Sequence, residues 1–221
     1  MVLITWNLFH GRAVPDRPRS LLPEFTTMLK GWDWDVALLQ EVPPWWPEPL
    51  AAATGAAQRT VLTSRNALLP LRRLIAERRP DLIKSNGGGS NAILVRGATI
   101  AQHRRRRMRF CPERRVLHAV RLQGGPWVAN IHATANPKRL ARADMAEAGD
   151  TLVRWTAGAP TVLGGDANVP DPQVPGFRDI GGHGIDRFFV RGGLEVAEPP
   201  RTLPRDGLSD HAPVRVVLRE P

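Results

Sequence analysis

Short apolar runs, each about the length of one β-strand, recur along the whole chain and limit what it can fold into. None of them is longer than a few residues, so they fit strands that are buried in a core. The ten predicted strands are Val2–Trp6, Val36–Leu39, Arg59–Leu62, Ala92–Val95, Thr99–Gln102, Val116–Leu122, Trp127–Ile131, Thr161–Leu163, Arg187–Arg191 and Val214–Leu218. Strands therefore dominate the predicted fold.

Helical spacing of apolar residues interrupts these strands in only a few places. Two helices are predicted at Ser20–Lys30 and Lys138–Trp155, and a third at Arg65–Glu77, where Pro70 leaves the first turn open. Strands mixed with a few long helices in this order favour an α/β fold. We predict a four-layer α/β sandwich, in which two mostly antiparallel sheets pack face to face with helices outside.

The sequence between one pair of predicted strands indicates a tight turn. Val116–Leu122 and Trp127–Ile131 flank Gly124-Gly125-Pro126, and glycine tolerates the positive φ of a tight turn, so an antiparallel hairpin is expected. Loops are predicted at Ser85–Ser90, Pro170–Pro175 and Glu198–Gly207.

The spread of apolar segments leaves no stretch free to form a second core, so we expect a single domain over residues 1–221. Met1 leads straight into a strand-like run, which predicts neither a signal peptide nor a membrane span. The single cysteine, Cys111, cannot form an internal disulfide and suits a reducing compartment. We expect a monomeric cytoplasmic protein without integral membrane association.

The charge of the chain favours phosphate-bearing partners. The formal net charge is +10, and 28 of the 31 basic residues are arginine. A field of this sign attracts polyanions, and the guanidinium fork matches pairs of phosphate oxygens. A genome rich in G and C would also write arginine in place of lysine, so the arginine excess alone does not identify a substrate.

Polar side chains stand where several predicted strands end. Asn7, Glu41 and His132 each follow an apolar strand, and Asp166 and Asn168 follow Val162-Leu163-Gly164-Gly165. Functional residues gather at such places because a rigid sheet holds the loop while leaving it open to substrate. Each of these residues alone has an ordinary structural explanation as a turn, a cap or a solvated side chain.

Their order along the chain resembles the endonuclease/exonuclease/phosphatase superfamily, which includes pancreatic-type deoxyribonuclease, abasic-site endonucleases, sphingomyelinases and inositol-polyphosphate phosphatases. The motifs that carry the resemblance are Thr5-Trp6-Asn7-Leu8, Leu39-Gln40-Glu41, Ser90-Asn91-Ala92-Ile93-Leu94, Ile131-His132, Gly165-Asp166-Ala167-Asn168, Ile185-Asp186 and Ser209-Asp210-His211. The resemblance covers almost the whole chain and implies the sandwich fold and phosphoester hydrolysis.

The resemblance and the donor chemistry together predict a metal site. Glu41 and Asp210 supply hard oxygen ligands that suit Mg²⁺, with Mn²⁺ as a possible substitute. Asn7 offers a neutral carbonyl oxygen, which by resemblance supports the metal or the scissile phosphate.

Four further residues are expected to carry the chemistry. His211 acts as a base or as a phosphate-binding cation, and the resemblance implies that Asp186 orients it. Asp166 aligns or deprotonates the attacking water, and the Asn168 amide donates a hydrogen bond to a phosphate oxygen. A plain loop carboxylate paired with Arg187 is the alternative for Asp186.

His132 distinguishes branches of the superfamily. Abasic-site endonucleases are expected to carry a tyrosine at this strand end, and the chain contains no tyrosine. The resemblance therefore makes His132 the acid for the leaving group. The chain departs from the family pattern just before it, because Ile131 stands where threonine or asparagine is usual.

Residues around the cleft are predicted to bind substrate. Arg12 and an exposed Trp45-Trp46 pair are expected to flank the cleft, and Asn91 belongs to a family motif. Arg114 or Arg115 matches a place where the family carries an arginine near the substrate. The Arg104–Arg109 run is either an anion-binding segment or a charged edge strand protected from aggregation.

Three functions remain open. The first is a Mg²⁺-dependent phosphodiesterase that cleaves DNA or RNA, favoured by charge and by His132. The second is a phosphatase or phospholipase-C-like enzyme acting on phosphoinositides or other phospholipids. The third is a non-catalytic anion-binding module, disfavoured because every catalytic element is intact. We predict the first, with nucleic acid as the partner.

Overall fold

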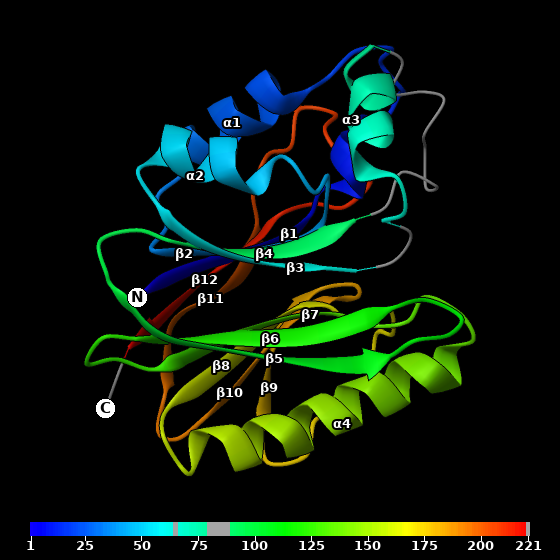
Figure 1. Cartoon of the computed structure of the whole chain (residues 1–221). Helices are drawn as coiled ribbons and strands as arrows, with labels where there is room; N and C mark the ends of the chain where they lie inside the picture. Colours follow the sequence, from blue (N-terminus) through cyan, green and yellow to red (C-terminus); the bar gives the residue numbers. More distant parts are fainter. Residues whose placement is uncertain (64–65, 79–88, 220–221) are drawn as a thin grey trace.

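Two six-stranded sheets pack face to face in the computed structural model, with helices on their outer faces (Figure 1). The structure describes residues 1–63, 66–78 and 89–219. The first sheet has the strand order β11-β12-β1-β2-β4-β3, and the second β5-β6-β7-β8-β10-β9. The predicted four-layer α/β sandwich is confirmed.

Neighbouring strands are antiparallel except for the pairs β1–β2 and β7–β8, which are parallel. The first sheet consists of β1 (Val2–Asn7), β2 (Val36–Val42), β3 (Ala57–Leu62), β4 (Ser90–Val95), β11 (Glu195–Thr202) and β12 (Val214–Arg219). The second consists of β5 (Ile100–Arg109), β6 (Arg115–Leu122), β7 (Trp127–His132), β8 (Thr161–Asp166), β9 (Arg178–His183) and β10 (Asp186–Arg191). The helices are α1 (Leu22–Gly31), α2 (Pro47–Thr54), α3 (Leu69–Arg78) and α4 (Lys138–Thr156), with a short 3-10 turn at Phe9–Gly11.

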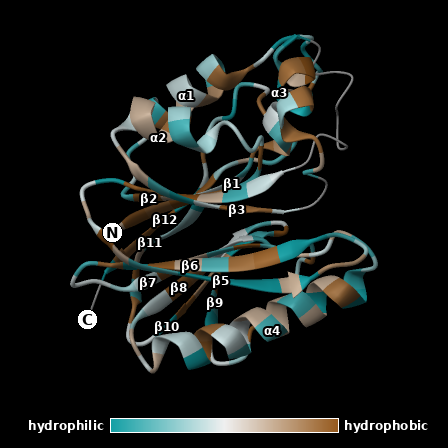
Figure 2. Ribbon diagram, viewed as in Figure 1, coloured by the Kyte–Doolittle hydropathy of each residue, from teal (hydrophilic) through white to brown (hydrophobic). Residues whose placement is uncertain are grey.

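Three apolar layers hold the sandwich together, and alternation along each strand explains them. In β1, Leu3 packs between the sheets while Ile4 packs under α1 and α2. In β8, Val162 lies between the sheets and Leu163 faces α4. Figure 2 shows brown hydrophobic stretches along the strands and a mixture of brown and teal on α4, the pattern of a helix with one face buried.

Three of the helices match the expected segments. α1 and α4 begin within two residues of their predicted starts, and α3 begins at Leu69, so that Pro70 occupies its first turn. The short helix α2, which also begins with a proline, was not predicted. Among the described residues, no helix is long and apolar enough to cross a membrane.

Two strands, β9 and β11, were not predicted, and both lie at sheet edges. β9 contains Gly181 and Gly182, and β11 contains Pro199 and Pro200, residues that disfavour a strand interior. The loop predicted at Glu198–Gly207 is wrong over its first five residues, which belong to β11. Proline is tolerated there because an edge strand leaves one row of N–H groups unpaired.

The expected hairpin is confirmed, with Ala119 of β6 opposite Ala129 of β7. β5 runs further than predicted and takes in the whole Arg104–Arg109 run as an edge strand. Of the predicted glycine-rich loop, residues 85–88 lie outside the described residues, and Ser90 begins β4.

A polar layer joins the two sheets just before the strands end. Gln40 of β2 donates a hydrogen bond to the Asn130 side chain of β7 over 2.8 Å, and a second, over 3.0 Å, to the Thr5 hydroxyl of β1. The Asn130 amide donates in turn to the backbone carbonyls of Leu39 and Ala92. Because all these groups are buried and paired, they fix the spacing of the sheets at this end.

Candidate active site

One further two-residue step along the strands leads from this polar layer to a cluster of buried polar side chains. Asn7 lies two residues beyond Thr5, and His132 two residues beyond Asn130. Asp166 ends β8 and lies opposite His132 on one side and opposite Asp186 of β10 on the other. The period of two residues in a strand therefore places these groups on the inner faces of the sheets.

Asp166 is the centre of this cluster and is 1% exposed. Its Oδ2 accepts a hydrogen bond from the Asn7 amide over 3.0 Å, and its Oδ1 accepts the backbone N–H of Asn168 over 2.8 Å. The Nε2 atoms of His132 and His211 lie 3.5 Å and 3.9 Å from Oδ2. Burial and the nearby charge of Asp186 raise the pKa of Asp166 to about 7.

His211 reaches the cluster from the loop before β12. Its Nδ1 donates to Oδ2 of Asp186 over 2.6 Å, which leaves Nε2 directed at Asp166. Burial lowers the pKa of His211, but the hydrogen bond and the negative charges of Asp186, Asp166 and Asp210 outweigh burial and raise it to about 9. The ring is therefore a cation at neutral pH. The pairing of Asp186 with His211 agrees with its expected orienting position, whereas Arg187 pairs with Asp179 instead.

Ser209 ties the His211 loop to the first strand. Its hydroxyl donates to the backbone carbonyl of Asn7 over 2.6 Å and accepts the N–H of His211 over 3.0 Å. The indole N–H of Trp6 donates to the carbonyl of His211. These bonds join residues some 200 positions apart in the chain and explain why Trp6 and Ser209 accompany the functional residues in their motifs.

His132 has a different electrostatic setting. Its side chain is 4% exposed, and Nε2 lies 3.8 Å from Oε1 of Glu41. Burial, followed by the positive charges of Arg115, His211 and His10, lowers the pKa of His132 well below 6.5. The ring is neutral here, so a role as leaving-group acid requires a bound negative charge to favour its protonation.

Glu41 turns into the site through local backbone geometry. Its φ is +50°, next to an irregularity in the pairing of β2 with β4. Its carboxylate lies 3.1 Å from Nε2 of His10, a residue that belongs to none of the family motifs. His10 also has positive φ, at +54°, in the turn that follows β1. A histidine close behind the Asn7 motif was the only hint in the sequence.

The side chains of Asn7 and Asn168 are partly engaged within the protein, Asn7 through one hydrogen bond besides the one that its amide donates to Asp166. Oδ1 of Asn7 accepts the N–H of Phe9 over 2.9 Å, so only its second lone pair remains for a metal. The Asn168 amide donates to the carbonyl of Ala133 over 2.8 Å, and its second N–H remains for a phosphate oxygen. The positive φ of Asn168, +55°, is one that asparagine tolerates well.

Asn91 is the clearest indication that something binds here. Its side chain is fully buried, yet neither its amide nitrogen nor its oxygen has a hydrogen-bond partner among the described residues. Leaving such a group unpaired costs roughly 1–3 kcal/mol, so a ligand that pairs with it restores stability. Asn91 was predicted to bind substrate, and its unpaired amide supports that expectation.

The other predicted substrate residues differ in their surroundings. Arg12 forms a two-pronged ion pair with Asp16 at 2.8–3.1 Å. Arg115 is buried and paired with Glu113, and its charge acts on His132. Arg114 is exposed.

The two tryptophans after Glu41 do not form an exposed pair. Trp45 is half-buried and packs against the outer core, and Trp46 is only 4% exposed beneath Gly11. The expectation of an exposed Trp45-Trp46 surface is therefore corrected for Trp46. The Trp46 ring packs directly against Gly11, whose close contact with the ring and positive φ (+76°) leave no room for a side chain there.

A buried carboxylate supports the loop after His132. Asp144 of α4 is fully buried and accepts the N–H and hydroxyl of Thr134 over 2.9 and 2.6 Å. Arg109 of β5 pairs with its other oxygen at 2.9–3.0 Å. Asp144 thereby positions Ala133, whose carbonyl holds Asn168. The sequence shows Asp144 only as a polar residue on the buried face of a predicted helix.

The donor groups suit a divalent cation. Carboxylate oxygens of Glu41 and Asp166 lie 3.8 and 3.5 Å from the same nitrogen of His132, so two carboxylates meet at one neutral ring. The ligand atoms of Asp166, Asp186 and His211 also lie within 4.8 Å of one another. His211 carries a positive charge and occupies Asp186, however, and this disfavours a cation there. The predicted set of Glu41, Asp210 and Asn7 remains our proposal, with Asp210 half-exposed and 3.9 Å from His211.

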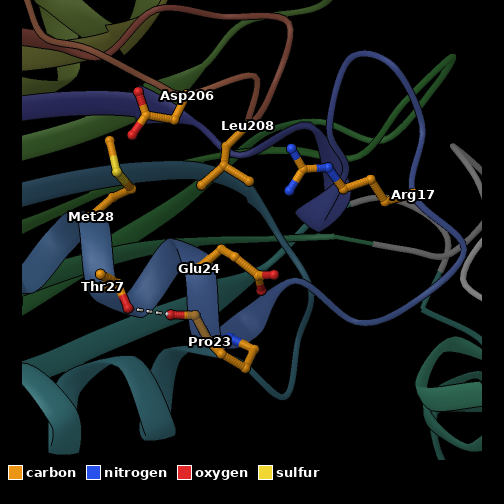
Figure 3. A pocket seen from close by; sticks show the side chains of 7 residues that line it. All are labelled: Arg17, Pro23, Glu24, Thr27, Met28, Asp206 and Leu208. Carbon is orange, nitrogen blue, oxygen red and sulfur yellow. Dashed lines mark hydrogen bonds between the residues drawn. The ribbon is translucent and has the colours of Figure 1, made fainter.

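A separate hollow of about 490 Å³ lies between the start of α1 and the segment that contains Asp206 and Leu208 (Figure 3). It is lined by Arg17, Pro23, Glu24, Thr27, Met28, Asp206 and Leu208. In Figure 3 the Thr27 hydroxyl donates to the carbonyl of Pro23, a helix-internal bond over 3.0 Å. No predicted catalytic residue lines this hollow, so we assign the chemistry to the Asp166 cluster.

A two-sheet sandwich with histidines, carboxylates and amides gathered at one end defines a phosphoesterase-type site. The chain belongs to the endonuclease/exonuclease/phosphatase family, whose model matches residues 4–211. The fold and the site thus place it among phosphoester hydrolases.

Solved structures confirm the fold. An endonuclease/exonuclease/phosphatase from Beutenbergia cavernae is 20% identical with a TM-score of 0.75, over 100% of this chain and 71% of that one. Mannosyl-6-phosphatase from Bacteroides thetaiotaomicron is 15% identical with a TM-score of 0.71, over 99% of both chains. TDP2 from Caenorhabditis elegans is 17% identical with a TM-score of 0.67, over 98% of this chain and 73% of that one. A comparison with curated protein sequences finds no match.

Proposed function

We propose that this chain is a Mg²⁺-dependent phosphodiesterase that hydrolyses nucleic acid. The observation that carries the proposal is the cationic His211, held by Asp186 and directed at a buried Asp166, together with an Asn91 amide that has no hydrogen-bond partner among the described residues. Such a cluster suits an anionic ester that brings its own oxygens and negative charge.

Asp166 is the residue we propose to orient the attacking water. Its carboxylate is fixed by Asn7 and by the Asn168 N–H, so its direction does not depend on substrate. With a pKa near 7, an appreciable fraction is ionised at neutral pH and can take the proton of the water as the new O–P bond forms.

The phosphoryl group is held by positive charge and by amides. We propose that Nε2–H of His211 donates to one non-bridging oxygen, and that the remaining N–H of Asn168 and the amide of Asn91 donate to the others. His211 and Asn168 are held in place by Asp186 and by the Ala133 carbonyl before substrate arrives, which is the condition for efficient stabilisation of developing charge.

His132 is the proposed acid for the leaving oxygen. Burial keeps its ring neutral in the free protein, and the negative charge of a bound phosphodiester favours the protonated form. The ring then gives its proton to the leaving oxygen as the ester bond breaks.

A divalent ion held by Glu41, Asp210 and the free lone pair of Asn7 would neutralise charge on the phosphoryl oxygens. His10, 3.1 Å from Glu41, would fix the direction of that carboxylate.

The test uses three substrates: supercoiled plasmid, a lipid phosphodiester such as sphingomyelin, and a sugar phosphate monoester. Each is incubated with purified protein and Mg²⁺, with Mn²⁺, or with a chelator. We expect nicking of plasmid that requires the metal. Faster turnover of the lipid or the monoester would replace nucleic acid as the substrate, and no metal-dependent turnover of any of them would contradict an enzymatic function.

Two variants test the assigned roles. His211→Ala and Asp166→Ala should each lower plasmid cleavage by at least about 10²-fold while the protein stays folded. Asp150→Ala removes an exposed carboxylate of α4 and serves as the matched control. Near-normal cleavage by either site variant would contradict the mechanism.

A further inference from the structure

A cationic groove of about 290 Å³ lies at the open edge of the sandwich, between edge strands β3 and β5. It is lined by Val61, Leu62, Arg105, Arg107, Arg114 and Val116, and we call it the edge groove. None of these lining residues is acidic. Figure 1 shows β3 facing β5 and β6 along the near edge of the molecule.

The arginine run of β5 divides between two faces of the strand. Arg104 donates to the backbone carbonyl of Trp155 in α4 over 2.7 Å, and Arg106 pairs with Glu147 of α4 at 2.9 Å. Arg109 pairs with the buried carboxylate of the same helix. These three side chains attach the edge strand to its helix, so they serve the fold.

The intervening arginines point the other way, into the edge groove. Arg105 and Arg107 are two residues apart on one face, a spacing of about 7 Å that resembles the distance between neighbouring phosphates of an extended polynucleotide. Phe110 follows and is 75% exposed, with the guanidinium of Arg107 lying 5.6 Å from its ring centre. Cations interleaved with an exposed aromatic ring are typical of single-strand binding, where bases stack on the ring.

The edge groove adjoins the active site. Val61 lies directly opposite Asn91 in the pairing of β3 with β4. Val116 follows Arg115, whose charge acts on His132. β5 lies two strands from β7 in the sheet, a separation of about 10 Å. A nucleic acid whose scissile phosphate lies at His132 therefore brings its next one or two phosphates within reach of Arg105 and Arg107.

We propose that the edge groove binds the phosphates that flank the cleaved bond in a single-stranded nucleic acid. The proposal rests on the phosphodiesterase function proposed above and specifies its substrate. A lipid headgroup presents its phosphates at one point, whereas these cations are arranged along a strand.

The experiment compares two double variants with the same loss of charge from the same strand. Arg105→Gln/Arg107→Gln alters the edge groove, and Arg104→Gln/Arg106→Gln alters the face bound to α4. Binding of a labelled twelve-residue oligothymidylate is followed by fluorescence anisotropy in chelator, from 50 to 200 mM NaCl. We expect the groove variant to bind about tenfold more weakly. Its negative slope of log affinity against log salt should also be shallower by about 1.4, which corresponds to the loss of two phosphate contacts. The control should bind within about twofold of the unaltered protein.

Equal losses in the two double variants would mean a general effect of net charge and would overturn the proposal, as would no loss in the groove variant. The proposal would also be overturned if the groove variant lost binding of vesicles that contain a phosphoinositide but kept its binding of the oligothymidylate. Melting temperatures establish that both variants are folded. Because binding in chelator needs no turnover, failure of the proposed catalysis is detected separately, by hydrolysis of bis(p-nitrophenyl) phosphate with Mg²⁺ by the unaltered protein.

Discussion

His118 provides a quantitative test of how the inner layer of the sandwich responds to pH. It lies in β6, is fully buried between the sheets, and its Nδ1 is 3.4 Å from Nε2 of His103. Its Nε2 has no hydrogen-bond partner among the described residues. Burial, followed by the charge of His103, lowers the pKa of His118 to about 3.

This shift makes folding stability depend on pH. An unfolded histidine titrates near 6.5, so below that pH the unfolded chain binds a proton that the folded chain excludes. The stability is fully present above about pH 6.5 and is lost progressively as the pH falls towards 3. With these two pKa values, His118 alone lowers the free energy of unfolding by about 2 kcal/mol between pH 7.5 and pH 5.0.

The assay is urea unfolding followed by tryptophan fluorescence in chelator, at pH 7.5 and pH 5.0, for the unaltered protein and His118→Gln. Glutamine does not titrate, so the difference in stability between the two proteins should change by about 2 kcal/mol in favour of the variant at the lower pH. His183→Gln, at an exposed histidine, is the control, and its difference should stay within about 0.5 kcal/mol. A difference for His118→Gln that is the same at both pH values would refute the reasoning.

Three further predictions concern the framework of the site. Gly165→Ala should destabilise the fold by about 4 kcal/mol or more, because a Cβ there would meet the carbonyl oxygen of Ile131 at 1.9 Å. Gly158→Ala, where a Cβ would meet nothing within 4 Å, should cost only about 1 kcal/mol. Denaturant unfolding of both variants compares the two losses of stability. Mg²⁺ at about 100 times its Kd should stabilise the protein by about 2.7 kcal/mol, and Glu41→Gln should lose most of this gain. The shift in melting temperature on adding chelator measures the gain in each protein. An undiminished gain in the variant would exclude Glu41 from the metal site. Asp144→Ala should lower the free energy of unfolding by about 3 kcal/mol, because it leaves the charge of Arg109 without its partner. It should also lower kcat, because the loop after β7 loses its contact with α4. A normal kcat in folded variant protein would contradict the positioning role.

The strands that bear the site were the most predictable part of the fold. Each crosses the buried middle of a sheet, so its apolar residues are required by burial and are visible as a run. Asn7, His132 and Asp166 stand at the ends of such runs, and the structure brings them together. β9 and β11 lie at edges, where one side faces solvent and glycine or proline is tolerated, and their sequences carry little strand signal.

Other parts of the site depend on contacts that no local pattern encodes. His10 meets Glu41 because two residues with positive φ redirect the turn after β1. Trp46 is buried because the chain folds back over it at Gly11. The roles assigned to His132, Asp186 and His211 followed from family resemblance, and they stay predictions. What the structure adds is the direction in which burial and neighbouring charges shift their pKa values.

The sequence by itself determined the fold class and which residues of the inner faces carry functional groups, because strand periodicity and motif order are properties of short segments. Only the tertiary structure decided which residues act on one another. It paired His211 with Asp186, left the Asn91 side chain without a hydrogen-bond partner in the described part of the chain, and divided one arginine run between a helix and a groove. These outcomes require distances between strands far apart in the chain, and such distances are set by the packing of the two sheets.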